Sequence, residues 1–588
     1  MLKRRYQLLL LASAVLMAFY PALSAEYCSI DDVEVLGRLQ QSQGTSFMDV
    51  VVPTSGSYYR PVIVASYLFD KRIFGLFPGF MHLENILLHL ANAFLVYFLT
   101  NLVLPSDKKN KSYLPLIAAL LFGLHPVNSE SVNWISGRTD LLAGIFVLTS
   151  AIYLLKFRTS FHRPYFYLAA AACVLGFLTK EVAFGLIPGA LFILTSTREE
   201  GGTDLVRVRM AQQLFRKQAI VAMGMVTAGS VFLIIRYHNL AISHSKIGMT
   251  LKYINDDLLH SMFVMLRAFC FYIKKMIVAH PLNFAIMEVD PFYQLAGPPL
   301  VLLIGYIASR RTLVSAIFIT GIFAIAPSFI IAFNQIAWTP YAERYLYVPS
   351  AFLIVASVAF LGSKSNAVSV GLIRGVVAAI VLVFAFSTLQ RSFTWSNDFN
   401  LVKDTVEKSP SSKVMRVVYG RYLIEKREYA NATVQLNAAR LIPSLSYDEN
   451  LDILTAYIHY LQGEYDAAEK TCRIVLEKTM GKSKTAVSIM IDLHEIKALS
   501  AATKQERRAV ERTLFGYHVM LYRLNSDPHI LYKLGVLAMN MGERKRAIKL
   551  FQQSINNMPK DDRYNVFAQN KIESLTRSMN NHDTFEHL

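Results

Sequence analysis

Long runs of apolar residues recur from Leu8 to about Leu389, and the rest of the chain follows a largely polar pattern. A helix needs about 20 apolar residues to cross the hydrocarbon core of a membrane, and flanking polar residues can complete shorter runs. The pattern predicts eleven membrane-spanning helices, at residues 8–25, 81–104, 113–124, 141–155, 165–178, 182–196, 218–235, 298–309, 313–333, 348–362 and 370–389. The sequence therefore predicts an all-α fold that begins with a polytopic membrane domain, residues 1–390.

The N-terminal residues allow two interpretations. Residues 1–25 combine a basic start, an apolar stretch and a small-residue end, as in a cleaved signal peptide, but they could also form a first span. We favour a retained span, because cleavage would leave the adjacent carboxylates of Asp31 and Asp32 close to a free N-terminus.

Basic residues concentrate beside alternate ends of the predicted spans. They are Arg4, Arg5, Lys108, Lys109, Lys156, Arg158, Arg216, Lys217, Arg310, Arg311 and Lys364. The positive-inside rule assigns these ends to the cytoplasm, so most of the formal net charge of +18 reports orientation. No nucleic-acid-binding motif accompanies the charge, and we expect no nucleic-acid partner.

One apolar segment, residues 258–279, carries three basic residues within it. They are Arg267, Lys274 and Lys275. Charged side chains at membrane depth are tolerated when they face protein or water. We therefore expect this segment to be re-entrant or to line a cavity, which leaves eleven spans and an external C-terminus.

Nearly all the unusual polar residues of the membrane domain fall in the predicted outer loops. These loops read SIDDVEVL (29–36), GSYYRPV (56–62), HPVNSESVNWISGRTD (125–140), TKE (179–181), AHPLNF (279–284) and WTPYAERYLYVPS (338–350). A channel would distribute polar residues through the membrane, and a transporter would place them near the midplane in broken helices. Polar residues gathered at one face indicate an active site that opens to the outside.

The four cysteines, Cys28, Cys173, Cys270 and Cys472, are widely spaced, and two of them lie in apolar segments. This spacing is typical neither of a disulfide framework nor of a zinc site. No other group of metal-ligating residues stands out in the sequence, and we assign no metal site.

A rhythm of 34 residues begins after Pro410 and matches the tetratricopeptide pattern. The matching residues are Gly420, Leu423, Tyr429, Ala432, Leu436 and Ala439 in the first unit, Ala456, Gly463, Tyr465, Ala468 and Cys472 in the second, and Leu531, Gly535, Ala538, Gly542, Ala547, Phe551 and Pro559 in the third. The predicted ranges are a linker (391–412), a repeat domain (413–575) with units near 413–446, 449–482 and 528–561, a degenerate helical stretch (481–526) and a polar tail (576–588). Such arrays form either a plain helical scaffold or a groove that binds an extended polypeptide.

Four segments carry a family resemblance, in this order along the chain. They read GSYYRPVIVASYLFDKRIFGLFPGFMHLENILLHLANA, FGLHPVNSESVNWISGRTDLLA, LTKEVAF and AERYLYVPS, and the repeats follow them. The chain resembles the transmembrane and tetratricopeptide-repeat-containing O-mannosyltransferases and their bacterial relatives, and more distantly the protein O-mannosyltransferases and other GT-C glycosyltransferases. The resemblance covers nearly the whole chain.

The resemblance implies a sugar donor linked to a lipid phosphate, usually mannose on a polyprenyl or dolichyl phosphate. It implies transfer to acceptors at the lumenal or periplasmic face, where the repeats also lie. An acidic residue in the first outer loop would act on the acceptor hydroxyl, and basic residues in later loops would hold the donor phosphate. Adjacent aspartates such as Asp31 and Asp32 could hold a divalent ion, as in some GT-C enzymes, but the mannosyltransferase-like relatives suggest no metal and no cofactor beyond the lipid-linked sugar.

Sugar transfer from a lipid phosphate needs a base for the acceptor hydroxyl and cations for the leaving phosphate. Asp31 and Asp32 match the acidic pair that follows the first span in the family. One of the two carboxylates would act as the base, and the other would orient it or tune its pKa. Alternatively, the pair caps the start of a helix.

The loops at 56–62 and 125–140 supply candidate donor contacts. Arg138 is the first choice, since a guanidinium can grip two phosphate oxygens, although it could also be a snorkelling side chain. Asp140 would orient Arg138 or cap the next helix. His125 would bond phosphate or sugar, or would be structural. Tyr59 and Arg60 would shape their loop, with Arg60 a further candidate for donor contact.

The later outer loops supply two acid–base pairs. Lys180 and Glu181 would form a structural ion pair, or Lys180 would face the phosphate. Glu343 and Arg344 match the late motif: Arg344 would supply a second cation, or the two would pair to fix the loop. Tyr345 would stack on sugar or line the lipid tail.

The leading hypothesis is a polyprenyl-phosphate-dependent O-mannosyltransferase in a bacterial inner membrane, with its active site and repeats facing the periplasm. The repeats would bind the protein acceptor or a partner. A non-catalytic, membrane-anchored scaffold for envelope proteins is the alternative from another class. A polyisoprenoid-linked transporter is a third hypothesis, and only the basic residues of segment 258–279 favour it.

Overall fold

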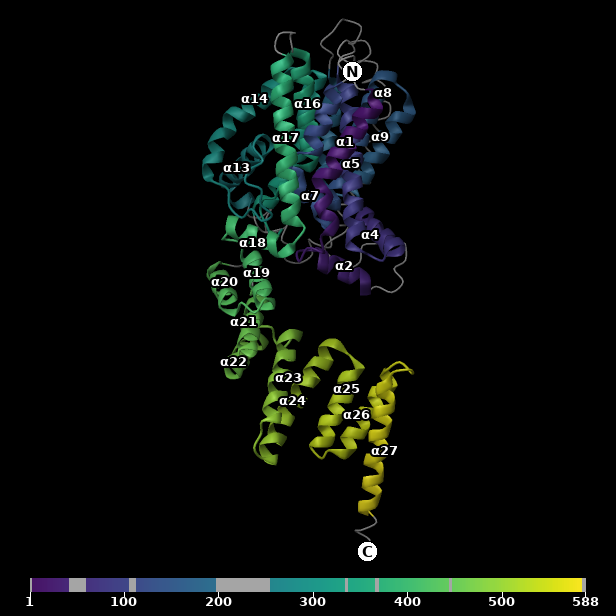
Figure 1. Cartoon of the computed structure of the whole chain (residues 1–588), viewed down its shortest axis with the longest axis vertical. Helices are drawn as coiled ribbons and strands as arrows, with labels where there is room; N and C mark the ends of the chain where they lie inside the picture. Colours follow the sequence, from purple (N-terminus) through teal and green to yellow (C-terminus); the bar gives the residue numbers. More distant parts are fainter. Residues whose placement is uncertain are drawn as a thin grey trace. The chain divides into compact units, whose positions relative to one another are not determined.

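The computed structural model describes residues 3–41, 60–104, 113–196, 254–333, 337–364, 370–443 and 447–583. The regular elements in these ranges are all helices, and the β-type pairing within them is one isolated antiparallel bridge between Ile286 and Tyr341. The chain divides into two compact units, Met1–Ser412 and Lys413–Leu588 (Figure 1). The predicted all-α fold class is therefore confirmed.

The first unit is a helical bundle. Its α-helices are α1 (Arg4–Phe19), α2 (Asp32–Gln41), α4 (Pro61–Phe74), α5 (Pro78–Val103), α6 (Leu114–Gly123), α7 (Ser129–Asn133), α8 (Arg138–Ser160), α9 (Arg163–Phe177), α10 (Leu186–Thr195), α13 (Leu258–Ile277), α14 (Gly297–Ser309), α15 (Leu313–Ile325), α16 (Tyr347–Lys364), α17 (Val370–Trp395) and α18 (Asp398–Lys408). Its 3-10 helices are η1 (Tyr20–Ser24), η2 (Pro126–Asn128), η3 (Ile135–Gly137), η4 (Glu181–Gly185), η5 (Pro291–Ala296), η6 (Ala326–Phe329), η7 (Ile331–Phe333) and η8 (Glu343–Leu346).

Seven described helical segments are long and apolar enough to cross a membrane. They are Arg4–Ser24, Pro78–Val103, Ile135–Ser160, Pro291–Ser309, Leu313–Phe333, Glu343–Gly362 and Gly375–Trp395, and three shorter apolar helices are Leu114–Gly123, Arg163–Phe177 and Glu181–Thr195. These segments coincide with ten of the predicted spans, and the remaining one, 218–235, lies outside the described residues. The chain is an integral membrane protein.

Close packing at small residues holds the centre of the bundle together. A β-carbon added at Gly185 in η4 would lie 2.5 Å from the backbone of Ala324 in α15, so the two elements touch through their main chains. Apolar side chains of α5, α6, α8 and α16 form the buried core of this unit. By contrast, α14 exposes most of its apolar surface, as expected for a helix that faces lipid.

The basic residues of segment 258–279 lie on α13 and find partners in the protein. Lys275 is buried and pairs with Glu343 at 2.7 Å, and Arg267 donates to Gln294 Oε1 at 3.2 Å. The helix also contributes Ile273 and Met276 to an apolar cavity. Lys275 and Arg267 thus face protein, as expected, while the cavity is lined by apolar side chains of α13; that the segment is re-entrant stays a prediction.

Residues 391–412, predicted to be a linker, belong to the first unit. They comprise the end of α17 and the amphipathic helix α18, which buries Leu401, Val402 and Val406. Arg391 pairs with Asp404 at 2.6 Å and holds the two helices together. The polar composition of this stretch concealed an apolar face with helical spacing.

The second unit is built from helix pairs. Its helices are α19 (Lys413–Glu425), α20 (Tyr429–Leu441), α21 (Glu449–Leu461), α22 (Tyr465–Lys478), α23 (Lys484–Leu499), α24 (Lys504–Asn525), α25 (Pro528–Asn540), α26 (Arg544–Asn557) and α27 (Arg563–Asp583). The pairs α19–α20, α21–α22 and α25–α26 coincide with the three predicted units, and α23–α24 occupies the degenerate stretch. Gly535 lets Phe551 pack against α25, since an added β-carbon would lie 2.6 Å from that ring.

Candidate active site

The first predicted catalytic residues lie where a turn leads into α2, at the end of the first unit where Figure 1 also shows α4 and α18. Asp32 is the first residue of α2 and is 1% exposed. Its Oδ2 accepts a hydrogen bond from the Cys28 amide at 3.1 Å. Its Oδ1 accepts from the backbone amide of Ser136 at 3.0 Å and also from the Ser136 hydroxyl. Burial raises the pKa of Asp32 to about 7, against these hydrogen bonds, which lower it.

Asp31 has different surroundings from its neighbour. Its side chain is exposed, and its backbone adopts the left-handed conformation at φ 63°. Aspartate and asparagine tolerate this conformation better than most residues. The negative charge of Asp31 contributes to the raised pKa of Asp32. Of the predicted pair, Asp32 has the environment of a general base, and Asp31 has the position of a modulator.

The loop 125–140 forms three short helical turns, η2, α7 and η3, before α8 begins. Arg138 in this loop is fully buried, and its Nη1 lies 2.6 Å from Asp70 and 3.1 Å from Glu84. Its Nε donates to Asn85 Oδ1 at 3.2 Å. With its donors engaged inside the protein, Arg138 anchors the loop to α4 and α5. This geometry argues against the predicted contact of Arg138 with a donor phosphate.

Asp140 does not hold Arg138, so that predicted pairing is wrong. Asp140 Oδ1 instead accepts from Lys180 Nζ at 2.6 Å, and both side chains are buried. Asp140 Oδ2 is buried and has no hydrogen-bond partner among the described residues. Burial lowers the pKa of Lys180, Asp140 opposes the shift, and the neighbouring charges of Arg60 and Arg344 lower the pKa further.

Arg344 lies in η8 and is 7% exposed. Its guanidinium forms a salt bridge with Glu130 of α7, and its backbone amide donates to the same carboxylate at 3.1 Å. Glu343 is not the partner of Arg344: it pairs with Lys275. The guanidinium also lies against Trp134, at 5.2 Å from the ring centre, and against Tyr345, at 5.0 Å.

Three of the predicted cations are thereby brought near one another. Lys180 interacts electrostatically with both Arg60 and Arg344, and its Nζ lies 5.7 Å from the ring centre of Tyr345. Arg60 forms a salt bridge with Glu181 at 2.9 Å, at the more exposed end of the group. Lys180 therefore pairs with Asp140 and not with the adjacent Glu181. Tyr59 lies outside the described residues.

His125 serves the structure of the loop. Its Nδ1 accepts from the Val127 amide at 3.2 Å, and its Nε2 lies 3.2 Å from the carbonyl oxygen of Met276. Burial lowers the pKa of His125 to about 4, so the ring is neutral near pH 7. Both nitrogens are occupied, which argues against the predicted contact of His125 with phosphate or sugar.

Trp134 connects the acid and the cations. Its indole Nε1 donates to the carbonyl oxygen of Ile30 at 3.3 Å, two residues before Asp32, while its ring contacts Arg344. The three tryptophans of the chain, Trp134, Trp338 and Trp395, all pack edge-on around Phe284, at 5.4, 5.0 and 4.8 Å between ring centres. Distant loops thus meet at one aromatic cluster.

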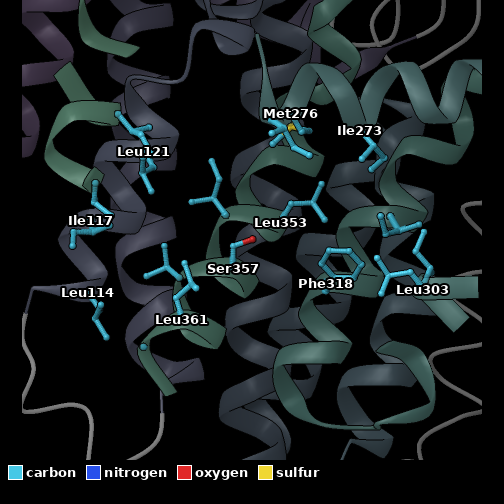
Figure 2. Close-up of a pocket in the computed structure, with 18 of the residues that line it drawn as sticks. Leu114, Ile117, Leu121, Ile273, Met276, Leu303, Phe318, Leu353, Ser357 and Leu361 are labelled. Atoms are coloured by element: carbon cyan, nitrogen blue, oxygen red, sulfur yellow. The ribbon is translucent and has the colours of Figure 1, made fainter. Parts of the chain in front are cut away.

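An apolar cavity of about 460 Å³ lies between α6 and helices α13 to α17. Figure 2 shows Met276 and Leu121 at one end of it, Leu114 and Leu361 at the other, and Ser357 between them. Of the described lining residues, only Tyr113 and Ser357 carry a side-chain oxygen. The cavity runs about 12 Å along α16, from Leu353 to Leu361, at 1.5 Å per residue.

The predictions overlooked Ser136, Glu130, Trp134 and Lys275, each of which contacts a predicted residue. Glu130 could have been noticed as an acid in the quoted loop, whereas Lys275 was noted as a charge in an apolar segment but not as the partner of Glu343. Ser136 carries no signal of its own in the sequence. Within the described ranges, no group of three histidine, cysteine, aspartate or glutamate residues is arranged to hold a metal ion.

Partial matches connect the chain to named proteins, while no family model matches it. The protein O-mannosyl-transferase TMTC2 of Homo sapiens is 32% identical over 158 residues, which is 25% of this chain and 18% of that protein. TMTC4 of Homo sapiens is 37% identical over 118 residues, which is 18% of this chain and 16% of that protein. TMTC1 of Mus musculus is 38% identical over 96 residues, which is 16% of this chain and 10% of that protein. The matched region thus spans less than a fifth of each of these relatives. These matches confirm the resemblance to the transmembrane and tetratricopeptide-repeat-containing O-mannosyltransferase family.

Proposed function

We propose that this protein transfers a mannosyl group from a polyprenyl-phosphate-linked donor to a hydroxyl of a protein acceptor. The observation that carries the proposal is the arrangement around Trp134. Its indole donates a hydrogen bond to the carbonyl oxygen of Ile30, two residues before the buried carboxylate of Asp32, whose pKa is near neutrality, and its ring contacts the buried cation Arg344. The relatives are named protein O-mannosyl-transferases, which supports the same class of reaction.

Asp32 is the general base of the proposed reaction. The carboxylate takes the proton of the acceptor hydroxyl while the hydroxyl oxygen attacks the anomeric carbon of the donor sugar. The bond between that carbon and the phosphate oxygen breaks, and the lipid phosphate leaves with the electron pair. A base whose pKa lies near the working pH is the most effective in such a step, and a pKa of about 7 meets this condition.

Lys180 and Arg344 stabilise the negative charge that develops on the leaving phosphate. Preorganised cations in a buried site are effective because they need no reorientation during the reaction. Asp140 and Glu130 hold them in place through the salt bridges described above. The second oxygen of Asp140, buried without a described partner, is suited to accept a hydrogen bond from a sugar hydroxyl. Arg60 is placed to attract the donor at the more exposed end.

The apolar cavity is suited to the isoprenoid tail of the donor. It lies between membrane helices, and its lining offers almost no hydrogen-bonding groups to a polar ligand. Met276 lies at one end of it, next to Lys275, which pairs with Glu343 beside Arg344. In this arrangement the tail lies in the cavity while the phosphate reaches the cations. The volume is within the range of small-molecule sites in proteins.

The helix pairs of the second unit supply the protein-binding function in this proposal. Arrays of such pairs present extended surfaces that recognise polypeptides. In this proposal the site and the repeats face the outer side, as the positive-inside rule predicts, and the outer side is the periplasm of a bacterial inner membrane. The proposed reaction needs no metal and no cofactor besides the lipid-linked sugar.

The test is a transfer assay with purified protein, mannosyl phosphoryl polyprenol and an acceptor protein from the same envelope. Asp32→Asn removes the base, and we expect the transfer rate to fall about 10²- to 10⁴-fold, the usual contribution of general base catalysis. Asp31→Asn is the matched control when both variants are assayed at alkaline pH, where Asp32 is ionised with or without the charge of Asp31, and asparagine tolerates the left-handed backbone of this position. Full activity of Asp32→Asn would contradict the assignment, and an inactive wild-type protein that binds the acceptor would favour the scaffold function.

A further inference from the structure

The two carboxylate oxygens of Asp32 have different surroundings. Oδ1 accepts two hydrogen bonds from Ser136, one from its amide and one from its hydroxyl, and Oδ2 accepts one, from Cys28. A carboxylate oxygen has about two lone-pair sites. Both sites of Oδ1 are therefore used, and one site of Oδ2 remains for an incoming proton.

The residues around Ser136 hold its donors in place. Asn85 Nδ2 donates to the carbonyl oxygen of Trp134 at 2.8 Å, and Tyr67 Oη donates to that of Ile135 at 3.3 Å. Arg138, fully buried and paired with acids of α4 and α5, fixes the other side of Ser136. The turn η3 is thus tied to two neighbouring helices, so the amide and hydroxyl of Ser136 are preorganised toward Asp32.

We infer that Ser136 is a positioning residue for the proposed reaction: it fixes the carboxylate of Asp32 and directs the acceptor proton to Oδ2. This inference rests on the proposed function. Hydrogen bonds to the ionised form of an acid favour ionisation. The serine hydroxyl therefore lowers the pKa of Asp32, although burial raises it.

Besides Tyr67 and Arg138, which hold the turn, four titratable groups lie around Asp32. Asp31 raises the pKa of Asp32 through its charge, and Asp398 accepts a hydrogen bond from the Ser29 amide at 3.1 Å. Burial raises the pKa of Tyr27 and that of Cys28, so neither ionises at neutral pH. Asp32, with a pKa of about 7, is therefore the group that the following measurements are designed to report.

Two measurements on the full-length protein test the inference. The first is the infrared band of the protonated carboxyl group as a function of pH, assigned to Asp32 by its loss in Asp32→Asn. The second is the pH profile of sugar transfer. Ser136→Ala removes one donor and keeps the backbone amide, and Ser136→Thr restores the hydroxyl. Ser131→Ala is the matched control, because Ser131 lies in the same loop and its buried hydroxyl has no described partner.

We expect Ser136→Ala to raise both midpoints by about one pH unit or more, the size of a hydrogen bond to a charged group. Transfer by this variant should recover at alkaline pH, and Ser136→Thr and Ser131→Ala should keep the wild-type midpoints. Unchanged midpoints in a folded Ser136→Ala variant would overturn the inference. If that variant does not fold, Ser136→Cys, a weaker donor, must show a smaller shift in the same direction. A band shift in a protein without transfer activity would contradict the proposed function while supporting the hydrogen bond.

Discussion

Filling the apolar cavity should impair use of the lipid-linked donor more than it impairs chemistry. Ser357 lies in the middle of the cavity, on the face of α16 that lines it. In Ser357→Phe, an aromatic ring takes space that the proposed isoprenoid tail would occupy. Because Ser357 is absent from the contacts described for Asp32, Lys180 and Arg344, we expect the variant to leave the reacting groups unchanged.

The expected rise in KM depends on where the isoprenoid tail lies before the donor binds. An unbound tail already lies in an apolar bilayer, so its transfer into the cavity gains little hydrophobic free energy. The relevant cost is overpacking, typically 1–3 kcal/mol for extra volume in a well-packed site. A cost of about 2 kcal/mol corresponds to a roughly 30-fold weaker interaction. We therefore expect the KM for the polyprenyl donor to rise about 30-fold in Ser357→Phe, with kcat nearly unchanged.

The assay compares steady-state transfer from a long-chain donor and from a mannosyl phosphate with a very short tail. The matched control is Leu302→Phe, which adds an aromatic ring on the exposed face of α14, outside the cavity. A normal KM of Ser357→Phe for the long-chain donor would refute the placement of the tail. An equal loss with the short-tailed donor would show a general defect in the protein, and thermal unfolding in detergent would identify it.

Three further predictions follow from the same contacts. Transfer should decline as the pH falls through about 7, because Asp32 must be ionised and only about a tenth of the carboxylates are ionised at pH 6. Asp31→Asn removes a negative charge and lowers the pKa of Asp32, so it should move the midpoint of the rate profile to lower pH. Arg138→Gln leaves Asp70 as an unpaired buried charge and should destabilise the membrane unit by about 3–5 kcal/mol, measured as an earlier unfolding transition in detergent, whereas unchanged unfolding would contradict the anchoring role. Gly535→Ala places a methyl group in contact with the aromatic ring of the facing helix and should lower the melting temperature of the repeat unit, measured by thermal unfolding; an unchanged melting temperature would contradict the close packing at Gly535.

The sequence predicted the membrane helices well, because hydrophobic length is a local property that survives any arrangement of the neighbours. Pairings between charged residues were predicted poorly. Arg138 was expected to bind the nearby Asp140, but its acid is Asp70, 68 residues away, and Asp140 binds Lys180, 40 residues away. Several acids compete for each cation in a folded bundle, and proximity along the chain carries little information about which one is close in space.

Residues without charge were the hardest to predict. Ser136 contacts Asp32 from 104 residues away, and serines are common enough that none in a loop attracts notice. The group formed by Lys180, Arg344 and Tyr345 was anticipated as a set of donor contacts, because unusual polar residues beside apolar segments are few. The residue types and their places beside apolar segments were therefore enough to predict most residues of the site. Their interaction partners depend on the three-dimensional fold and could not be predicted.

The aromatic cluster around Phe284 has an optical consequence. Indole rings emit most of the ultraviolet fluorescence of a protein, and all three in this chain lie within one cluster that also touches Arg344. The entire tryptophan emission of the unmodified protein therefore originates beside the site. A change in that emission on adding a lipid-linked sugar would report occupancy directly, without a label and without turnover.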